Sequence, residues 1–433
     1  MTMRKEAIFS KDFILVAIGR IVSAFGNQIL RYALPLYLLV QTGSSALFGT
    51  IMAVSFIPMI LLFPIGGIIA DRLNKRNIML VLDLCTAILI SLFCFLSGKV
   101  NIVPLMTGTM IILYGLDGAD RPAVKASVPV LAGEKHIMKA NAVIDMVDST
   151  SSMAGPVTGG LLFAAFGLMP ILYISIGCFF ASVVLDCFIH IPYKKRAISE
   201  NIFLTGMRDI KESFHFMLQE RRVLWKISLV FGASNLLLTS LILIGLPVII
   251  TQRLEFAPET ANRLYGYAQG VFAAGAVAGG FFAGLLSNKL TSKVGPVLLV
   301  GCSLCIIIGG AALQILNTPM TVYLVLICSC GLLLAIHTIF QIQTVTYLQL
   351  LTPKDFVGKV ISCFMCVVMC TMPLGQLIYG FVFEHIGNMI CLPFYLAGVV
   401  MTVISLLTRG VFRGIDHQMA EITRSGVGKG CSC

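Results

Sequence analysis

The amino-acid sequence predicts an all-α membrane protein with about twelve transmembrane helices. Of its 433 residues, 58% are hydrophobic and only 12% are charged, and its mean hydropathy is +0.94. A soluble protein of this length does not have a core large enough to bury so much apolar surface. Stretches of ~20 residues without a charged side chain recur along the chain, and a helix needs this length to cross a bilayer. The ~10-residue alternating segments of a membrane β-barrel are not seen.

The predicted spans form two groups, separated by the longest polar stretch of the chain at 192–226. The first group covers residues 13–40, 45–70, 78–97, 103–124, 137–166 and 168–191. The second group covers residues 227–251, 264–287, 294–316, 320–352, 360–383 and 389–408. The sequence therefore predicts four parts, which are a six-helix bundle at 1–191, a cytosolic linker at 192–226, a second bundle at 227–408 and a cytosolic tail at 409–433. Apolar residues at helical spacing within 203–217 predict an interfacial amphipathic helix in the linker.

The net charge of +11 is explained by membrane topology. With the N-terminus placed in the cytosol, the basic residues concentrate in cytosolic segments, and the external loops keep only Lys99, Arg253 and Arg263. This asymmetry is the positive-inside pattern of multi-pass proteins. We therefore expect a plasma-membrane protein with both termini in the cytosol and no nucleic-acid partner.

The two groups of spans show internal similarity. Gly66-Gly67 is repeated as Gly279-Gly280, and Leu34-Pro35 is repeated as Leu246-Pro247. Parallel repeats of this kind are related by an axis along the membrane normal, with the binding site between them near the midplane.

A charged loop joins the second and third predicted spans. Gly67 permits a close helix approach, and Asp71 can cap a neighbouring helix N-terminus. The basic residues beside them can pair with acidic residues at helix ends and hold a cytosolic gate in one state. The gating motif consists of Gly67, Asp71, Arg72, Lys75 and Arg76. It resembles the loop signature of the major facilitator superfamily, from which it departs at Asn74 and Lys75. Asn tolerates a left-handed backbone, so we expect the turn to survive.

A run of small residues follows in the fifth predicted span. Small side chains allow tight helix packing, and a proline weakens one helical turn, which suits a helix that bends or slides during transport. The motif consists of Gly155, Pro156, Gly159 and Gly160. It resembles the glycine-proline motif of the antiporter branches of the superfamily, although plain packing explains it equally well.

At finer grain, the chain resembles the macrolide-efflux branch, a group of drug:proton antiporters. The resemblance runs over about residues 13–407. The residues that carry it are Thr42-Gly43-Ser44, Asp83, Arg121-Pro122-Ala123, Ala140-Asn141-Ala142 and Gly358-Lys359-Val360. It implies efflux of drugs or metabolites by alternating access, driven by the proton gradient.

An ionisable side chain inside a membrane span costs free energy. Such residues are therefore expected to face a cavity, to form an ion pair or to take part in transport. Arg20, Asn27 and Arg31 follow one stripe of the first span. Asp117 precedes Arg121 by four residues, which favours an intrahelical ion pair. Two further acids lie three residues apart on the fifth span, where coupling to protons and a gate-stabilising salt bridge are equally good interpretations. The proton-coupling candidates are Asp145, Asp148, Asp117, Asp120 and Arg121.

The second half of the chain offers polar candidates without a permanent charge for a substrate cavity, Gln269, His337 and Gln341. A lone histidine on an apolar helix is more often a hydrogen-bonded core residue than a functional one.

No nucleophile-base pair, metal cluster or phosphate loop is present in the sequence, so we expect neither an enzyme nor a cofactor. The 14 cysteines lie mostly inside the spans and are expected to act as small apolar residues. The predicted partners are a small apolar substrate, protons and the lipid bilayer, and the chain is expected to act as a monomer. Two alternatives stay open, a transporter of lipids or lysophospholipids on the same fold and a transport-inactive membrane sensor.

Overall fold

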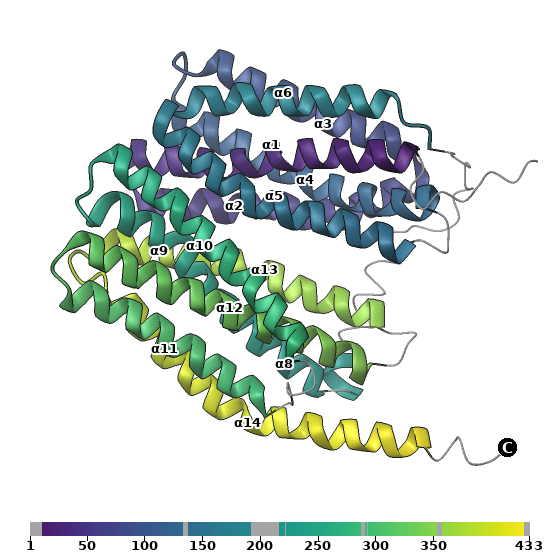
Figure 1. Cartoon of the computed structure of the whole chain (residues 1–433), viewed down its shortest axis with the longest axis vertical. Helices are drawn as coiled ribbons and strands as arrows, with labels where there is room; N and C mark the ends of the chain where they lie inside the picture. Colours follow the sequence, from purple (N-terminus) through teal and green to yellow (C-terminus); the bar gives the residue numbers. More distant parts are fainter. Residues whose placement is uncertain are drawn as a thin grey trace, which may run out of the picture. The chain divides into compact units, whose positions relative to one another are not determined.

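A computed structural model describes residues 11–132, 137–191, 216–220, 222–286, 291, 293–352 and 357–427. Every regular element in these ranges is helical (Figure 1). Eleven of the described helical segments are long and apolar enough to cross a membrane. A further helix, α5 (Ile137–Phe166), is 30 residues long but is not among these eleven, because its many serine, threonine and glycine residues make it less apolar. Because α5 packs beside α1, α4 and α6, we count it as the twelfth span, and the predicted all-α membrane fold is confirmed.

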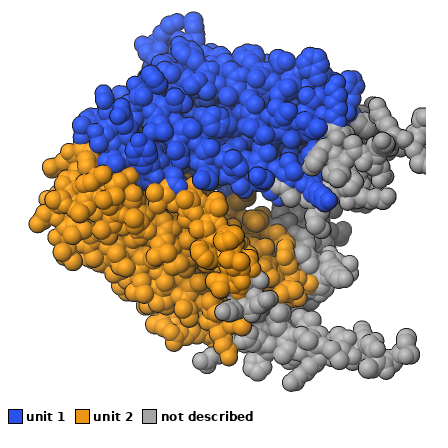
Figure 2. Space-filling view, in the orientation of Figure 1, with its two compact units in different colours: residues 1–203, 257–270 blue, residues 204–256, 271–433 orange. Residues whose placement is uncertain are grey.

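The helices divide between two compact units, which Figure 2 shows in different colours. Unit 1 comprises residues 1–203 together with residues 257–270, the first part of α10 (Pro258–Leu285). Its other helices are α1 (Lys11–Thr42), α2 (Ser45–Arg72), α3 (Lys75–Leu96), α4 (Ile102–Ala132), α5 and α6 (Leu168–Cys187).

Unit 2 comprises residues 204–256 and 271–433. Its first span is continuous from Arg222 to Arg253 and contains two π-helical turns. Its helices are η2 (Phe216–Glu220), α8 (Arg222–Ser234), η3 (Asn235–Thr239), α9 (Ser240–Val248), η4 (Ile249–Arg253), the rest of α10, α11 (Val294–Ile315), α12 (Pro319–Leu351), α13 (Val357–His385) and α14 (Leu392–Val427).

Two helices extend past the limits that hydropathy suggests. The helix α8 begins at Arg222, inside the predicted linker, and α14 continues to Val427, inside the predicted tail. Hydropathy detects the part of a helix that lies in lipid, but it does not detect a polar extension with good helix-forming residues. Most of the predicted amphipathic helix at 203–217 lies outside the described residues.

Local sequence explains how two of the helices begin. The Ser44 side chain accepts a hydrogen bond from the backbone N–H of Leu47 at 3.1 Å and caps α2. The Asn74 side chain accepts from the N–H of Arg76 at 3.1 Å and caps α3. Because the backbone of Asn74 is extended, with φ of −66°, the expectation of a left-handed residue is wrong. Asparagine serves here as an N-cap.

In each of the two repeats, a glycine allows the same pair of helices to pack closely. A Cβ atom on Gly66 of α2 would lie 2.7 Å from the Cα of Ala119 of α4. A Cβ atom on Gly279 of α10 would collide with the backbone of Ala335 of α12. In each half of the chain, these two helices are the second and the fourth span. The glycine repeat in the sequence therefore corresponds to a repeated packing contact within each unit.

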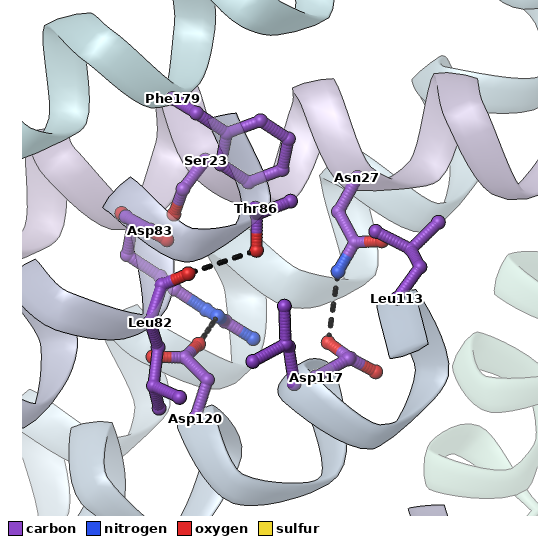
Figure 3. Close-up of a pocket in the computed structure, with 11 residues that line it drawn as sticks. Ser23, Asn27, Leu82, Asp83, Thr86, Leu113, Asp117, Asp120 and Phe179 are labelled. Carbon is purple, nitrogen blue, oxygen red and sulfur yellow. Dashed lines mark hydrogen bonds and ion pairs between the residues drawn. The ribbon is translucent and has the colours of Figure 1, made fainter. Parts of the chain in front are cut away.

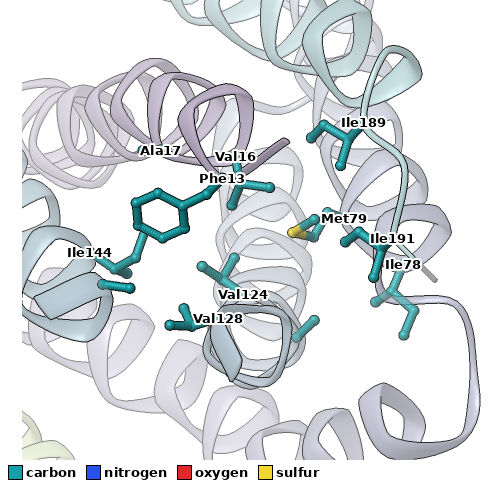
Figure 4. Close-up of a cluster of buried hydrophobic side chains, with 12 residues drawn as sticks. Phe13, Val16, Ala17, Ile78, Met79, Val124, Val128, Ile144, Ile189 and Ile191 are labelled. Carbon is teal, nitrogen blue, oxygen red and sulfur yellow. The ribbon is translucent and has the colours of Figure 1, made fainter. Parts of the chain in front are cut away.

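One end of unit 1 is closed by buried apolar side chains, which we call the apolar layer (Figure 4). It lies where α1, α3 and α5 begin and α4 and α6 end. The layer consists of Phe13, Val16, Ala17, Ile78, Met79, Ala123, Val124, Val128, Ala140, Ile144, Ile189 and Ile191. Burial of this surface removes water from the region next to the charged residues described below.

Candidate functional site

Charged side chains from three helices meet inside unit 1. Arg20 of α1 is buried and binds two carboxylates. Its Nη1 lies 2.5 Å from Oδ2 of Asp120 in α4, and its Nε donates to Oδ1 of Asp148 in α5 at 2.8 Å. One guanidinium therefore ties α1 to both α4 and α5.

Asp117 is the second centre of this network, and only 2% of its side chain is exposed. Its Oδ2 accepts from Nη1 of Arg31 at 2.7 Å and from Nε of Arg121 at 3.1 Å. Its Oδ1 accepts from Nδ2 of Asn27 at 3.0 Å. The guanidinium of Arg31 also lies over the Tyr114 ring, 3.9 Å from its centroid. The structure thus contains the predicted pair of Asp117 and Arg121, and it adds Arg31 as a second cation.

The network is balanced in charge, since its three arginines face three aspartates. A buried ion pair is not a large net source of stability, because both partners lose their hydration. Removal of one partner leaves an uncompensated charge, which is strongly destabilising. The ion pairs therefore tie α1, α4 and α5 together and disfavour any rotation that separates the partners.

A cavity of about 200 Å³ opens beside the network. Its exposed charges have opposite sign, since the side chain of Arg121 is 35% exposed and that of Asp148 is 29% exposed. The lining residues are Arg20, Ala24, Asn27, Gln28, Asp117, Arg121, Asp148, Ser149 and Ser152. We call this space the large cavity. Its wall offers a cation, a carboxylate, amides and hydroxyl groups to a ligand.

The structure separates the two acids that the sequence placed on one face of the fifth span. Asp148 lines the large cavity, whereas the side chain of Asp145 is 61% exposed and lies 3.4 Å from Lys125. A separation of three residues leaves an offset of about 60° around a helix. That rotation is enough to turn Asp145 out of the network.

The glycine-proline motif is a packing surface. Cβ atoms on Gly155 and Gly159 would collide with or crowd Gln28 and Tyr32 of α1. A Cβ atom on Gly160 would meet Gly266 of α10, within unit 1. α5 continues through Pro156 without a break.

The gating motif is only partly described. Gly67, Asp71 and Arg72 belong to the last turns of α2, but their side chains lie outside the described residues. Lys75 is half-buried at the first position of α3. Arg76 donates from Nε to the carbonyl of Asp186 at 2.8 Å and from Nη2 to that of Cys187 at 2.6 Å. Arg76 therefore contacts a helix end, but its partners are the backbone carbonyls at the negative end of α6 and not the side chains of acidic residues that we expected.

The three candidates from the second half belong to different units, with His337 and Gln341 in unit 2 and Gln269 in unit 1. His337 is buried, its Nε2 lies 3.0 Å from Oγ of Ser234, and its ring stacks on Phe231. These contacts fit the interpretation of a core histidine. Gln341 is exposed, and Gln269 is half-buried in the part of α10 that belongs to unit 1.

Two buried acids were not among the sequence-based site candidates. Asp83 of α3 and Asp186 of α6 are 7% and 4% exposed. Among the described residues, neither has an ion-pair partner within 4.0 Å. The signal was present in the sequence, because each is an acid inside an apolar span.

Comparison with known proteins shows what the chain is similar to. The sequence profile of the Major Facilitator Superfamily matches residues 16–348. The chain is 24% identical to the uncharacterized MFS-type transporter YfiS of Bacillus subtilis (strain 168), with 96% of this chain and 97% of YfiS covered. It is 22% identical to macrolide efflux protein A of Streptococcus pyogenes, with 89% and 92% covered. The POT family transporter PepTSo superposes with a TM-score of 0.70 at 14% identity, with 94% and 99% covered, which shows a shared fold.

Proposed function

Because the chain belongs to the major facilitator superfamily, we propose that it is a proton-coupled exporter of hydrophobic drugs or metabolites. Membership of the superfamily makes it a secondary transporter in a membrane, and the similarity to a macrolide efflux protein supports export. Fold and family do not identify a substrate. The choice of substrate class therefore rests on the residues of the site.

The large cavity is the observation that carries this proposal. Its lining combines Arg121 and Asp148 with serine hydroxyls and amides, which is a polar surface in a protein surrounded by lipid. Ligand sites in proteins are mostly apolar, with a few polar groups that fix orientation. We infer that this wall holds the polar part of an amphiphilic substrate, while apolar surfaces of the protein hold the rest.

Asp148 is the best candidate for direct contact with a substrate cation. One of its oxygens binds Arg20, and the side chain is partly exposed to the large cavity. A substrate amine placed there would form a charge-assisted hydrogen bond, which is stronger than a neutral one. We therefore propose export of compounds with a basic nitrogen, by a monomer working through alternating access.

The test is an untargeted comparison of compounds retained by cells with the protein, without it, or with Asp148→Asn at equal expression. We expect the wild-type protein alone to lower the retention of amphiphilic bases. A radiolabelled macrolide and a lysophospholipid are included as defined probes. Equal retention of all compounds in the three strains would refute export. Reduced retention of the lysophospholipid alone would refute the proposed substrate class and favour lipid transport.

A further inference from the structure

A second and much smaller cavity lies deeper in unit 1 (Figure 3). Its volume is about 10 Å³, which is close to the smallest space that holds one water molecule. The polar residues around it are Arg20, Ser23, Asn27, Asp83, Thr86, Asp117 and Asp120. Such a space requires two to four polar partners to hold a water, and these residues provide them. We call it the small cavity.

An unsatisfied atom belongs to a residue that lines the small cavity. Oδ1 of Asn27 is buried and has no hydrogen-bond partner among the residues that the structure describes, while Nδ2 of the same amide donates to Asp117. A buried acceptor without a partner costs about 1–3 kcal/mol. A water molecule in the small cavity would donate to Asn27 and still have a proton to share with a carboxylate.

The two cavities share a wall. Arg20, Asn27 and Asp117 line both of them. A proton that enters the large cavity therefore reaches the small cavity by crossing one layer of polar side chains. The apolar layer lies about one helical turn from these charges, toward the end of unit 1 where α1, α3 and α5 begin. Water-mediated transfer through that layer is unfavourable, so the polar route leads from the large cavity.

Asp83 is the acid at the end of this route. The charged groups that face it are Arg20 from α1, Asp120 from α4 and Asp186 from α6. Arg20 is already bound by Asp120 and Asp148. Asp83 and Asp186 therefore add two acids to a network whose arginines are already paired. An ionised carboxylate without a paired cation is costly in such surroundings, whereas a carboxylic acid needs no cation.

We propose that Asp83 binds and releases the coupled proton, through a water molecule held in the small cavity. The carboxylate of Asp83 accepts one proton from this water, and the water regains one proton from solvent in the large cavity. One O–H bond forms on Asp83 and the water is restored, so the net change is the uptake of one proton. Release follows the same steps in reverse.

The geometry also links this proton to the substrate, a link that rests on the function proposed above. When Asp83 is ionised, it attracts Arg20 and weakens the hold of Arg20 on Asp148. Asp148 then becomes available to a substrate cation in the large cavity. When Asp83 is protonated, Arg20 remains on Asp148 and competes with the substrate. Proton and substrate thus exclude each other, as export in exchange for protons requires.

Infrared difference spectroscopy on the purified protein in lipid nanodiscs tests the proposal without any substrate. We expect a pH change to produce a carbonyl stretch from a protonated carboxyl group, with a frequency shift in heavy water. Asp83→Asn is expected to remove this band. The matched control, Asp145→Asn, removes an exposed acid and is expected to retain it. Absence of the band in the wild-type protein, or its persistence in Asp83→Asn, would overturn the proposal.

A second variant covers the possibility that Asp83→Asn fails to fold. Asn27→Leu keeps every carboxyl group but removes the unsatisfied acceptor of the small cavity. We expect the band to remain and its frequency to shift, because the water that bonds to Asp83 is lost. An unshifted band would refute the water-mediated route. If the wild-type protein shows the Asp83 band but exports no drug, the proposed function is rejected and the proposed proton site is retained.

Discussion

Replacement of Asp117 by asparagine tests whether the charged network determines the packing of unit 1. The change keeps the shape of the side chain but removes its charge. In the wild-type protein Oδ2 of Asp117 accepts from both Arg31 and Arg121. After the change, Arg31 keeps the Tyr114 ring as a neighbour but loses its carboxylate. The arginine becomes a cation without a counter-ion in a membrane protein.

The expected loss in free energy of unfolding follows from the burial of the Asp117–Arg31 ion pair. The side chains of Asp117 and Arg31 are 2% and 14% exposed, so solvent screens this pair weakly. Breaking a buried pair costs about 3–5 kcal/mol, which we expect as the loss in free energy of unfolding. Arg121 adds little, because its side chain is 35% exposed and its pair is screened by solvent. Asp145→Asn breaks the surface pair with Lys125 and is expected to cost about 0–1 kcal/mol.

Unfolding of the purified variants in mixed micelles, titrated with a denaturing detergent, measures these differences. Arg31→Gln combined with Asp117→Asn is expected to recover part of the loss, because the stranded cation is removed as well. A loss for Asp117→Asn no larger than that for Asp145→Asn would refute the reasoning. Failure of the double variant to recover any stability would show that the cost does not come from an unpaired charge.

Further predictions concern packing, the end of α6 and topology. Gly118→Ala places a Cβ atom 2.7 Å from the carbonyl oxygen of Met59, so we expect a loss of about 1–3 kcal/mol and reduced expression. Gly177→Ala meets no atom within 4 Å and serves as the control, and equal expression of the two variants would contradict this packing argument. Arg76→Ala removes two hydrogen bonds from the carbonyl end of α6 and is expected to cost about 0.3–1 kcal/mol, measured by the same unfolding assay. A gain in stability would contradict that role. A cysteine placed at Arg208 is expected to resist an impermeant thiol reagent added outside intact cells, and labelling there would contradict a cytosolic linker.

The spans were predictable because the bilayer imposes a physical length on any helix that crosses it. The pair of Asp117 and Arg121 was predictable for a similar reason, since the helical repeat fixes where residue i+4 lies. The sequence also indicated that Arg20 and Arg31 share a stripe of α1, and both bind aspartates in unit 1. In each case a local geometric rule applies.

The acids that bind the arginines of that stripe were not predictable. Asp120 and Asp148 lie 100 and 128 residues from Arg20 along the chain. Which acids reach Arg20 depends on the rotation of α4 and α5 about their own axes, and packing contacts such as Gly155 against α1 determine that rotation. The same rotation excludes Asp145, although its spacing from Asp148 suggested a common role.

The wide sequence separation of these ion pairs has a consequence for synthesis. α1 leaves the ribosome before α4 and carries Arg20 and Arg31, whereas the acid that binds Arg31 is 86 residues away. At about 5–20 residues per second, several seconds pass before α4 is complete. During that time each arginine costs about 2.5–3.5 kcal/mol on an insertion scale if it lies near the bilayer centre. The first span is therefore marginal in the membrane until later spans arrive. We expect chains that end before α4 to lose α1 from the bilayer and to be degraded.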